Sequence, residues 1–480
     1  MLFTSWAFLK FLPIVFFLHY LRASVTWQAG VLTIGSFVFY GWENPWLLPL
    51  LLISTVINAE AARKLIEPER IPQSRRKILI GALAFNLGAL GFFKYAGLVA
   101  RVILPGTAFQ EWASWVGKIP LPVGISFYTF QGISLVVDAW RAPSGNLHGL
   151  RATHGAGELF RFHEKVWFFK AFFPQLIAGP IVKAGQFLPQ IAPKRLRDID
   201  WDSAVRSLIA GFFLKMVIAD NLKEYTSMLS HKLAPSIEGG DALVLLYAFS
   251  LQIFSDFCGY SLIALGLAKL FGYDLPLNFL NPYLSRSITE FWQRWHLSLS
   301  SWLREYLYIP LGGNREGEWK TYRNLFLVMF LGGLWHGAAW TYAAWGTAHG
   351  VLLAIERACK LGTKADVLRP LRGIAEWGRV FIIFNAVSLL WLLFKLPEYG
   401  DVVIVLKAIA TTPTTFTPPM AVRICFFALP VLAWQVRASR PDLRLPQKYA
   451  FGADVLLHAG MLWLICVNSG ASGDFIYFQF

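Results

Sequence analysis

The chain has 480 residues, of which 56% are hydrophobic and only 15% charged, and it contains 20 Trp and 40 Phe. A soluble protein of this length cannot enclose so many apolar side chains in a core, so the composition predicts a polytopic membrane protein. The formal net charge of +15 comes from short basic clusters between apolar runs. This pattern is typical of the cytoplasmic loops of membrane proteins and excludes nucleic acid as a partner.

Apolar segments that could cross a membrane recur along the whole chain, since a spanning helix needs about 20 residues. They lie near residues 4–22, 27–43, 46–62, 78–96, 120–138, 204–220, 241–271, 324–340, 342–358, 379–395, 421–436 and 453–468. Gly259 is a candidate bend in the long segment 241–271. The apolar pieces near 98–104, 166–182 and 401–411 are short or interrupted, which predicts re-entrant or interfacial segments. The expected fold class is an all-α polytopic membrane protein with about 11–12 transmembrane helices.

Basic loops predict the orientation of these spans, because cytoplasmic loops carry an excess of Lys and Arg. They include RKLIEPERIPQSRRK, PKRLRD, REGEWKTYR, ERACKLGTKADVLRPLR and VRASRPDLRLPQK. With these loops in the cytoplasm, the N-terminus and the tail after residue 468 both lie on the outer side. The first apolar segment has neither a basic n-region nor a cleavage site, so we expect a retained span and not a signal peptide.

No metal site is expected from the cysteines or from the loop histidines. Four cysteines, Cys258, Cys359, Cys425 and Cys466, are scattered in or beside apolar segments, which predicts packing residues. The longest polar insertion, residues 144–165, holds His148, His154 and His163 at irregular spacings. A metal site is one interpretation of these histidines, and we favour a solvated loop.

His336 lies inside an apolar run, next to Trp335. It follows Arg323 by 13 residues. A straight helix therefore carries its ring about 20 Å inward, past the middle of a hydrocarbon core about 30 Å thick. Ionisable groups at this depth are costly and indicate function, although a histidine that bonds two helices is the alternative. A neutral imidazole in a low-dielectric pocket would suit a general base.

His296 lies in the basic, tryptophan-rich segment EFWQRWHLSLSSWLREY. Apolar residues, including Trp295, mark one helical face of this segment, and Arg294 and Arg304 lie on the other. The pattern predicts an interfacial helix. From the residues alone we favour a histidine whose polar tip lies among lipid headgroups. The arginines could be membrane anchors or a binding site for an anionic donor such as a phosphorylated carrier.

Four stretches resemble a known family. They are PYLSRSITEFWQRWHLSLSSWLREYLYIPLGGN, YRNLFLVMFLGGLWHGAAWTYAAWG, LPVGISFYTFQGISLVVDAWR and FFPQLIAGPIVK. Through them the chain resembles, over nearly its whole length, the membrane-bound O-acyltransferase (MBOAT) family and more closely its bacterial alginate O-acetyltransferase branch. The resemblance implies a single membrane domain, residues 1–480, with helices around a central tunnel. It also implies a catalytic core at about residues 120–358 and an extracytoplasmic tail at 469–480.

The resemblance also implies roles for particular residues. His336 matches the catalytic histidine of the family, and His296 matches a histidine on the same acyl-transfer path. Candidates for contacting the donor or lining the tunnel are Trp335, Trp295, Arg294 and Arg304. In one departure, Leu262 stands where related sequences often have Asp, although Asp256 lies nearby.

The C-terminal sequence GDFIYFQF frames Tyr477 with phenylalanines. One interpretation is an aromatic belt at the outer membrane interface. In related systems a similar C-terminal tyrosine is proposed as a transient acyl carrier, and Tyr477 is our candidate for such a relay. The phenol pKa of about 10 is close to the thiol pKa of about 8.5, so an aryl ester would keep much of the transfer potential of a thioester.

The expected reaction moves an acetyl group from a cytoplasmic thioester such as acetyl-CoA, with no bound cofactor. His336 acts as general base on the acceptor hydroxyl, and His296 orients the thioester or stabilises the oxyanion. The resemblance implies a bacterial inner-membrane protein, surrounded by lipids, with both termini in the periplasm. It further implies a periplasmic, SGNH-hydrolase-like acetyltransferase partner, polysaccharide export machinery and an exopolysaccharide acceptor such as alginate.

Two alternatives remain open. The acceptor could be peptidoglycan, cellulose or another envelope polymer, or the acyl group could differ. A proton-coupled transporter is an alternative of another class, and it predicts further acids near His336. The sequence offers only a few such acids, among them Asp138, Asp256 and Glu356.

Overall fold

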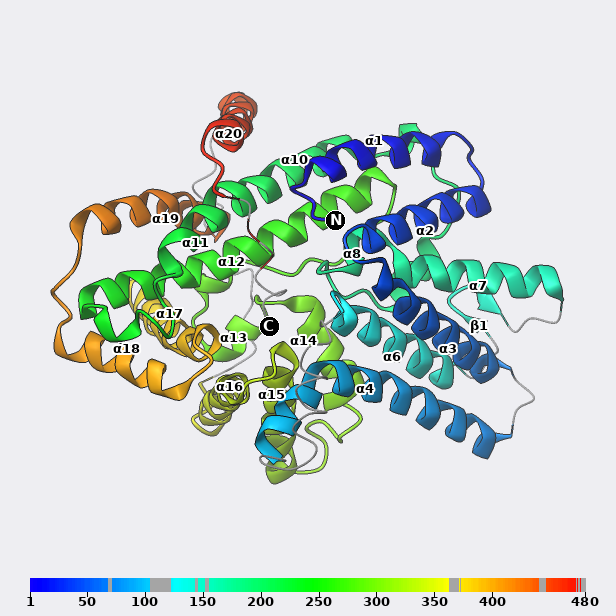
Figure 1. Cartoon of the computed structure of the whole chain (residues 1–480), viewed down its shortest axis with the longest axis horizontal. Coiled ribbons are helices and arrows are strands. Elements are labelled where there is room, and N and C mark those ends of the chain that lie inside the picture. Colours follow the sequence, from blue (N-terminus) through cyan, green and yellow to red (C-terminus); the bar gives the residue numbers. More distant parts are fainter. Residues whose placement is uncertain are drawn as a thin grey trace. The chain divides into compact units, whose positions relative to one another are not determined.

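The computed structural model describes residues 1–67, 71–103, 122–142, 146–151, 155–361, 371, 373–439, 446–471, 473 and 475. In these ranges the regular elements are helices, apart from a two-residue antiparallel hairpin of β1 (Asn146–Leu147) and β2 (Leu150–Arg151) (Figure 1). The predicted all-α fold class is confirmed.

The chain divides into two compact units, each made from two stretches of sequence. The first comprises Met1–Leu208 and Ile263–Pro276, and the second comprises Ile209–Leu262 and Leu277–Phe480. Two of the boundaries fall inside helices, α10 (Trp201–Phe212) and α12 (Gly239–Leu270), rather than in linkers. The single domain expected for residues 1–480 stays a prediction.

The first unit contains the N-terminal helices and an aromatic core. Its helices are α1 (Trp6–Tyr20), α2 (Val25–Gly41), η1 (Pro45–Leu47), α3 (Leu48–Ile66), α4 (Pro72–Ile103), α6 (Ile125–Arg141), α7 (Ala156–Ala171), α8 (Phe173–Leu176), α9 (Ala184–Phe187), η2 (Leu188–Gln190) and η3 (Leu196–Asp198). The ring of Phe173 packs against Phe8, Phe11 and Phe39 with centroid distances of 5.4–6.2 Å. Such tilted and edge-to-face pairs join α1, α2 and α8, and the backbone N–H of Phe173 also donates to the Ser36 hydroxyl at 2.9 Å.

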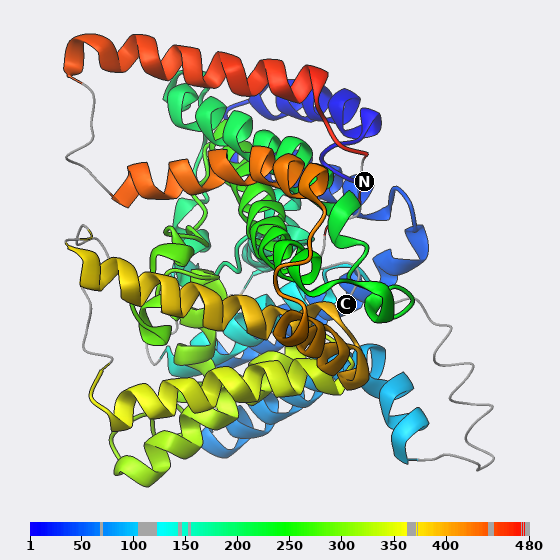
Figure 2. The same cartoon turned by 90° about the vertical axis from the view of Figure 1, so that its left-hand side faces the viewer.

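The second unit contains every residue of the candidate site that the structure describes. Its helices are η4 (Phe213–Ala219), α11 (Asp220–Thr226), η5 (Ala234–Ser236), η6 (Pro282–Leu284), α13 (Ile288–Trp292), α14 (Leu297–Leu303), η7 (Arg304–Tyr308), α15 (Glu318–His336), α16 (Trp340–Ala358), α17 (Ile374–Lys395), α18 (Tyr399–Thr411), α19 (Pro418–Ser439) and α20 (Gln447–Val467). Helix α16 packs along α15 and also against α17 (Figure 2). Elements η4 and η7 are π-helical turns.

Helices long and apolar enough to cross a membrane confirm the polytopic class. Six described helices meet this criterion: Pro45–Ile66, Pro72–Val99, Gly239–Leu270, Ile374–Lys395, Pro418–Arg437 and Tyr449–Val467. The other expected spans also lie on helices, but those are shorter or carry more charge; α1 has 15 residues, and α2 and α6 have 17 each. The apolar piece expected as re-entrant near 98–104 is instead, as far as the structure describes it, the end of α4.

Gly259 permits close packing within the second unit. Helix α12 stays helical through this residue. A Cβ atom there would lie 2.8 Å from the carbonyl oxygen of Gly211 and 2.9 Å from the amide nitrogen of Lys215. Only glycine therefore lets α12 approach the α10–η4 segment this closely. This contact, which brings Lys215 to α12, is the role that the structure gives to the residue.

Candidate active site

His296 lies in a sharp turn between two short helices. The chain leaves α13 after Trp292 and begins α14 at Leu297, and His296 between them has φ 46° and ψ 55°. This left-handed conformation is uncommon for residues other than Gly, although Asn, Asp and His adopt it more often than the rest. The predicted continuous interfacial helix is therefore wrong at this point. His296 is fully buried, which also contradicts a side chain whose tip lies among headgroups.

Backbone pairing with an upstream segment holds the turn in place. Leu280 N donates to Arg294 O at 3.0 Å, and Leu297 N donates to Asn278 O at 3.0 Å. The Asn278 carboxamide is buried, accepts from the Ser298 hydroxyl at 2.6 Å and donates to the Ser261 hydroxyl at 3.0 Å. These bonds satisfy the polar groups on both sides of His296. The periodicity of residues 288–303 could not reveal them.

The contacts of the His296 ring define its tautomer. Its Nδ1 accepts a hydrogen bond from Leu299 N at 3.4 Å and so caps α14. Burial lowers the pKa of His296, which lies outside the predicted spans, to about 3 because desolvation disfavours the cation. The neutral ring therefore carries its proton on Nε2. Among the described residues this buried N–H has no acceptor. A buried donor without a partner costs about 1–3 kcal/mol, which indicates a place for a ligand oxygen.

His336 is the last residue of α15 and is 4% exposed. Its ring contacts Trp335, Trp345 and Phe394 at centroid distances of 4.9, 5.2 and 5.2 Å. The next residue, Gly337, has no room for a side chain, because a Cβ atom would lie 2.2 Å from the Tyr342 ring. The chain thus leaves the helix at His336 inside an aromatic enclosure.

Trp335 connects the two predicted histidines. Its indole lies 4.9 Å from the His336 ring and 6.2 Å from the His296 ring, centroid to centroid. Trp295 belongs to the same aromatic group, since it packs on Trp391 at 5.1 Å and Trp391 packs on Trp345 at 5.5 Å. The structure therefore brings four of the predicted site residues together within the second unit. Their chemical roles stay predictions.

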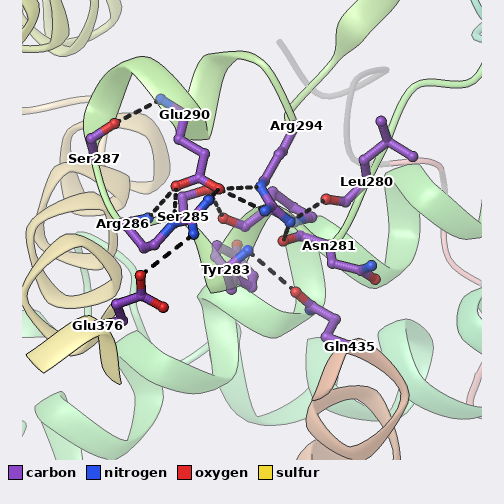
Figure 3. A network of polar contacts seen from close by, with 11 residues as sticks. Leu280, Asn281, Tyr283, Ser285, Arg286, Ser287, Glu290, Arg294, Glu376 and Gln435 are labelled. Atoms are coloured by element: carbon purple, nitrogen blue, oxygen red, sulfur yellow. Dashed lines mark hydrogen bonds and ion pairs between the residues drawn. The ribbon is translucent and has the colours of Figure 1, made fainter. Parts of the chain in front are cut away.

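Arg294 is buried in an ion network, as Figure 3 shows. Its guanidinium donates to Glu290 Oε1 through Nε at 3.0 Å and through Nη2 at 2.6 Å. Arg286 contacts the same carboxylate at 2.9 Å and approaches Glu376 at 3.9 Å. The prediction that Arg294 lies on an exposed polar face is wrong. Paired and fully hydrogen-bonded, it stabilises the loop before His296. The other arginine, Arg304 in η7, is exposed.

Two acids predicted to lie in the membrane have fixed partners. The carboxylate of Glu356 accepts from Ile288 N at 2.5 Å and from Thr289 N at 2.9 Å, which anchors α13 on α16. Asp256 lies 2.8 Å from the ammonium of Lys215. Neither arrangement resembles a proton relay that leads to His336, so these acids give a transporter no support.

His349 is a buried residue that our sequence reasoning missed. Its ring stacks on Phe291 at 6.0 Å and meets Trp292 at 5.2 Å and Trp345 at 4.9 Å. Neither ring nitrogen has a hydrogen-bond partner among the described residues. Trp345 joins this histidine to His336. Like His336, His349 is a histidine inside an apolar run, residues 342–358, and this position is the sequence signal that indicates it.

The loop histidines belong to the first unit or lie outside the described residues, and the tail tyrosine also lies outside them. Tyr477 and His154 are outside the described residues. His163 forms an ion pair with Glu60 at 2.9 Å. The ring of His148 packs closely on Gly185, since a Cβ atom on that glycine would lie 2.8 Å from Nε2 of the histidine. Over the described ranges, no three side chains of His, Cys, Asp or Glu are grouped so that they could hold a metal ion.

Glycines set the spacing between α15, which carries His336, and α16, which carries Trp345. A Cβ atom on Gly346 would lie 2.2 Å from Met329 O and 2.9 Å from the Cα atom of Gly333. Small residues at such crossings let helices approach until their backbones touch.

We expect Gly346→Ala to destabilise the protein by at least about 1–3 kcal/mol, because the extra methyl forces the two helices apart. The measurement is thermal unfolding of the purified protein in detergent. Gly378→Ala in α17 is the matched control, since its methyl would meet no atom within 4 Å. Equal unfolding temperatures for the two variants would contradict the close crossing.

Helices able to cross a membrane, together with buried histidines, indicate a functional site within a membrane protein. A family model for the membrane-bound O-acyltransferase family, MBOAT, matches residues 165–395, a range that contains both predicted histidines. The chain is 38% identical over 401 residues to the "Probable alginate O-acetylase AlgI" of Pseudomonas aeruginosa. This match covers 82% of this chain and 72% of that protein. The chain belongs to the membrane-bound O-acyltransferase family, and it is an acyltransferase.

Other relatives differ in the polymers that their names give. The chain is 35% identical over 394 residues to a peptidoglycan O-acetyltransferase of Helicobacter pylori, covering 78% of this chain and 72% of that protein. It is 30% identical over 299 residues to a teichoic acid D-alanyltransferase of Streptococcus thermophilus, and this match covers 57% of this chain and 68% of that protein.

Proposed function

We propose that this chain is an O-acetyltransferase that moves acetyl groups from a cytoplasmic thioester, such as acetyl-CoA, across the inner membrane for the O-acetylation of alginate. The observation that carries the proposal is the group of His296, Trp335 and His336 in a chain that is 38% identical to an alginate O-acetylase. In this proposal both termini face the periplasm. A periplasmic SGNH-hydrolase-like acetyltransferase and the export machinery receive the acetyl group.

His336 is the general base of the proposed reaction. An acceptor hydroxyl loses its proton to the neutral imidazole while its oxygen attacks the carbonyl carbon of the thioester. The C–S bond then breaks, the imidazolium returns the proton to the leaving thiolate, and the products are an ester and a free thiol. The aromatic enclosure of His336 supports this role, because a side chain that is only 4% exposed leaves little room for water to compete with the acceptor hydroxyl for the ring.

His296 is the proposed electrophilic partner. Because Nδ1 is occupied by the amide of Leu299, the ring presents an N–H at Nε2 and cannot act as a base there. A buried donor without a protein acceptor suits the carbonyl oxygen of the thioester, which gains negative charge during attack. The two histidines thus have different tasks that follow from their different surroundings.

Peptidoglycan is the second candidate acceptor, because an O-acetyltransferase for that polymer is 35% identical over 78% of the chain. The difference between 35% and 38% identity is too small to choose a polymer. Mass spectrometry of alginate and peptidoglycan from cells with and without the intact chain tests the choice. Loss of acetyl from peptidoglycan alone would overturn the alginate proposal.

Tyr477 is the proposed first acceptor of the acetyl group. When the purified protein is incubated with acetyl-CoA, we expect mass spectrometry to find an acetyl group on this residue, because an aryl ester keeps most of the energy of the thioester. Tyr477→Phe retains the aromatic ring and removes only the hydroxyl, so it should abolish both this adduct and polymer acetylation. Unchanged polymer acetylation in that variant would eliminate the relay and leave a simple aromatic belt.

A further inference from the structure

A buried ion cluster that includes neither of the two histidines lies in the second unit. Its centre is Lys215 in η4, whose Nζ lies 2.7 Å from Asp220 Oδ1 and 2.8 Å from Asp256 Oδ1. All three residues are buried. Ions removed from solvent are costly unless each is paired and hydrogen-bonded. The proposed acetyl transfer gives this cluster no task.

The third partner of Lys215 comes from the C-terminal tail. An ammonium group has three N–H donors and no acceptor. Two donors face the aspartates, and Nζ also donates to the carbonyl oxygen of Gly473 at 3.1 Å. The hydrogen-bonding capacity of the lysine is therefore complete only when the tail is in place. Without the tail, one N–H of the buried ammonium would have no acceptor. The free-energy cost of an unpaired buried donor is higher for a charged group than for a neutral one.

Two further hydrogen bonds hold the tail against the same segment. Gly470 N donates to Met216 O at 2.9 Å, and Asn221 Nδ2 donates to Asn468 O at 2.9 Å. The fit is close, because a Cβ atom on Gly470 would lie 2.6 Å from both the amide nitrogen of Asn221 and the carbonyl carbon of Asp220. The tail thus lies directly on the backbone of the η4–α11 segment.

The tail continues from these anchors towards His296. Phe475 is buried, and its ring lies 4.6 Å from the Tyr260 ring and 5.8 Å from the Phe257 ring. Phe257 in turn meets the His296 ring at 4.6 Å. One aromatic ring therefore separates the tail from the histidine that carries the unpartnered N–H.

We propose that Lys215, Asp220 and Asp256 form a latch that holds the C-terminal tail in the second unit at its described residues Asn468, Gly470, Gly473 and Phe475. This latch makes Lys215 a positioning residue for the acceptor side of the acyl-transfer site. The proposal rests on the proposed function, since it supplies a reason for Phe475 of the tail to lie one aromatic ring away from His296. Lys215 touches neither donor nor acceptor and acts only through the tail.

The test compares four variants of the full-length protein in detergent, of which Lys215→Arg is the conservative one. Gly470→Ala displaces the tail by contact with backbone and changes no charge, and Gly460→Ala in α20 is its control because its methyl would meet no atom within 4 Å. Lys215→Met removes the ammonium at similar length. The first measurement is hydrogen exchange of the peptide that covers residues 468–475. The second is the rate of acetyl transfer from acetyl-CoA, with separate kcat and KM values.

In Gly470→Ala and Lys215→Met we expect exchange of the tail to be faster by about 10-fold or more, because its local opening becomes easier. The same variants should lose kcat while KM for acetyl-CoA stays unchanged, and Lys215→Arg should restore part of the loss. Tail exchange equal to that of Gly460→Ala would overturn the latch, and faster exchange with unchanged kcat would overturn the positioning role. Absence of acetyl transfer in the unmodified protein would refute the proposed function, while hydrogen exchange would still decide the latch.

Discussion

A His336→Ala variant is expected to lose acetyl transfer by about 10²–10⁴-fold, the usual contribution of a general base. The loss should fall on kcat, because the ring acts on the acceptor proton and not on the donor. The measurement is release of free thiol from acetyl-CoA, together with acetylation of the polymer in cells. His336→Gln, which keeps a polar side chain of similar size, should lose as much and so exclude a packing defect.

The control for this result is another histidine that the structure places elsewhere. His231 has an exposed side chain, 69% accessible, and bonds Asp401 at 2.9 Å. His231→Ala should retain full transfer. If both His336 variants insert normally into the membrane and still acetylate at the native rate, His336 is not the base.

His296→Asn is expected to fold normally and to lose about 10²–10³-fold in kcat, as when one oxyanion donor is removed. Asparagine tolerates the left-handed conformation at φ 46°, and its side-chain oxygen can still accept the N–H of Leu299. The substitution therefore keeps both structural tasks of the residue and removes only the Nε2 donor. His296→Ala should lose stability as well, because it also removes the helix cap.

The pH profile gives an independent reading of this role. Since the pKa of buried His296 is lowered to about 3, its ring stays neutral at any working pH. Its removal should lower the whole kcat–pH profile without moving either limb. A shift of the acid limb in His296→Asn would show that this histidine titrates during the reaction, which contradicts an N–H donor.

Local properties of the sequence were sufficient for the class of the protein. Apolar runs of spanning length predict helices wherever they occur. The bilayer core offers no water to backbone N–H and C=O groups, and a helix pairs these groups within one segment. The depth of His336 follows from its distance along one helix, so its burial was predictable. The burial of His349 was equally predictable, because this residue also lies well inside an apolar helix.

Interactions between distant segments were beyond the reach of periodicity. The apolar pattern of residues 288–303 continues through His296 as in a helix, but Asn278 and Leu280 bind the chain on either side and break it there. Glu290 and Arg294 are four residues apart, a spacing from which an ion pair is predictable, but their burial depends on the packing of other segments around them. The polar face that contains Arg294 was therefore predicted to be exposed, although Arg294 is buried.

The membrane class, the family motifs and the burial of His336 follow from the sequence, because each depends on neighbours within about one helix. Packing between distant segments makes His296 a buried N–H donor, places Trp335 between both histidines, and completes the bonds of Lys215 with the C-terminal tail. The last contact spans 258 positions. No local pattern records such a pairing, since it exists only once the helices between the two partners have packed.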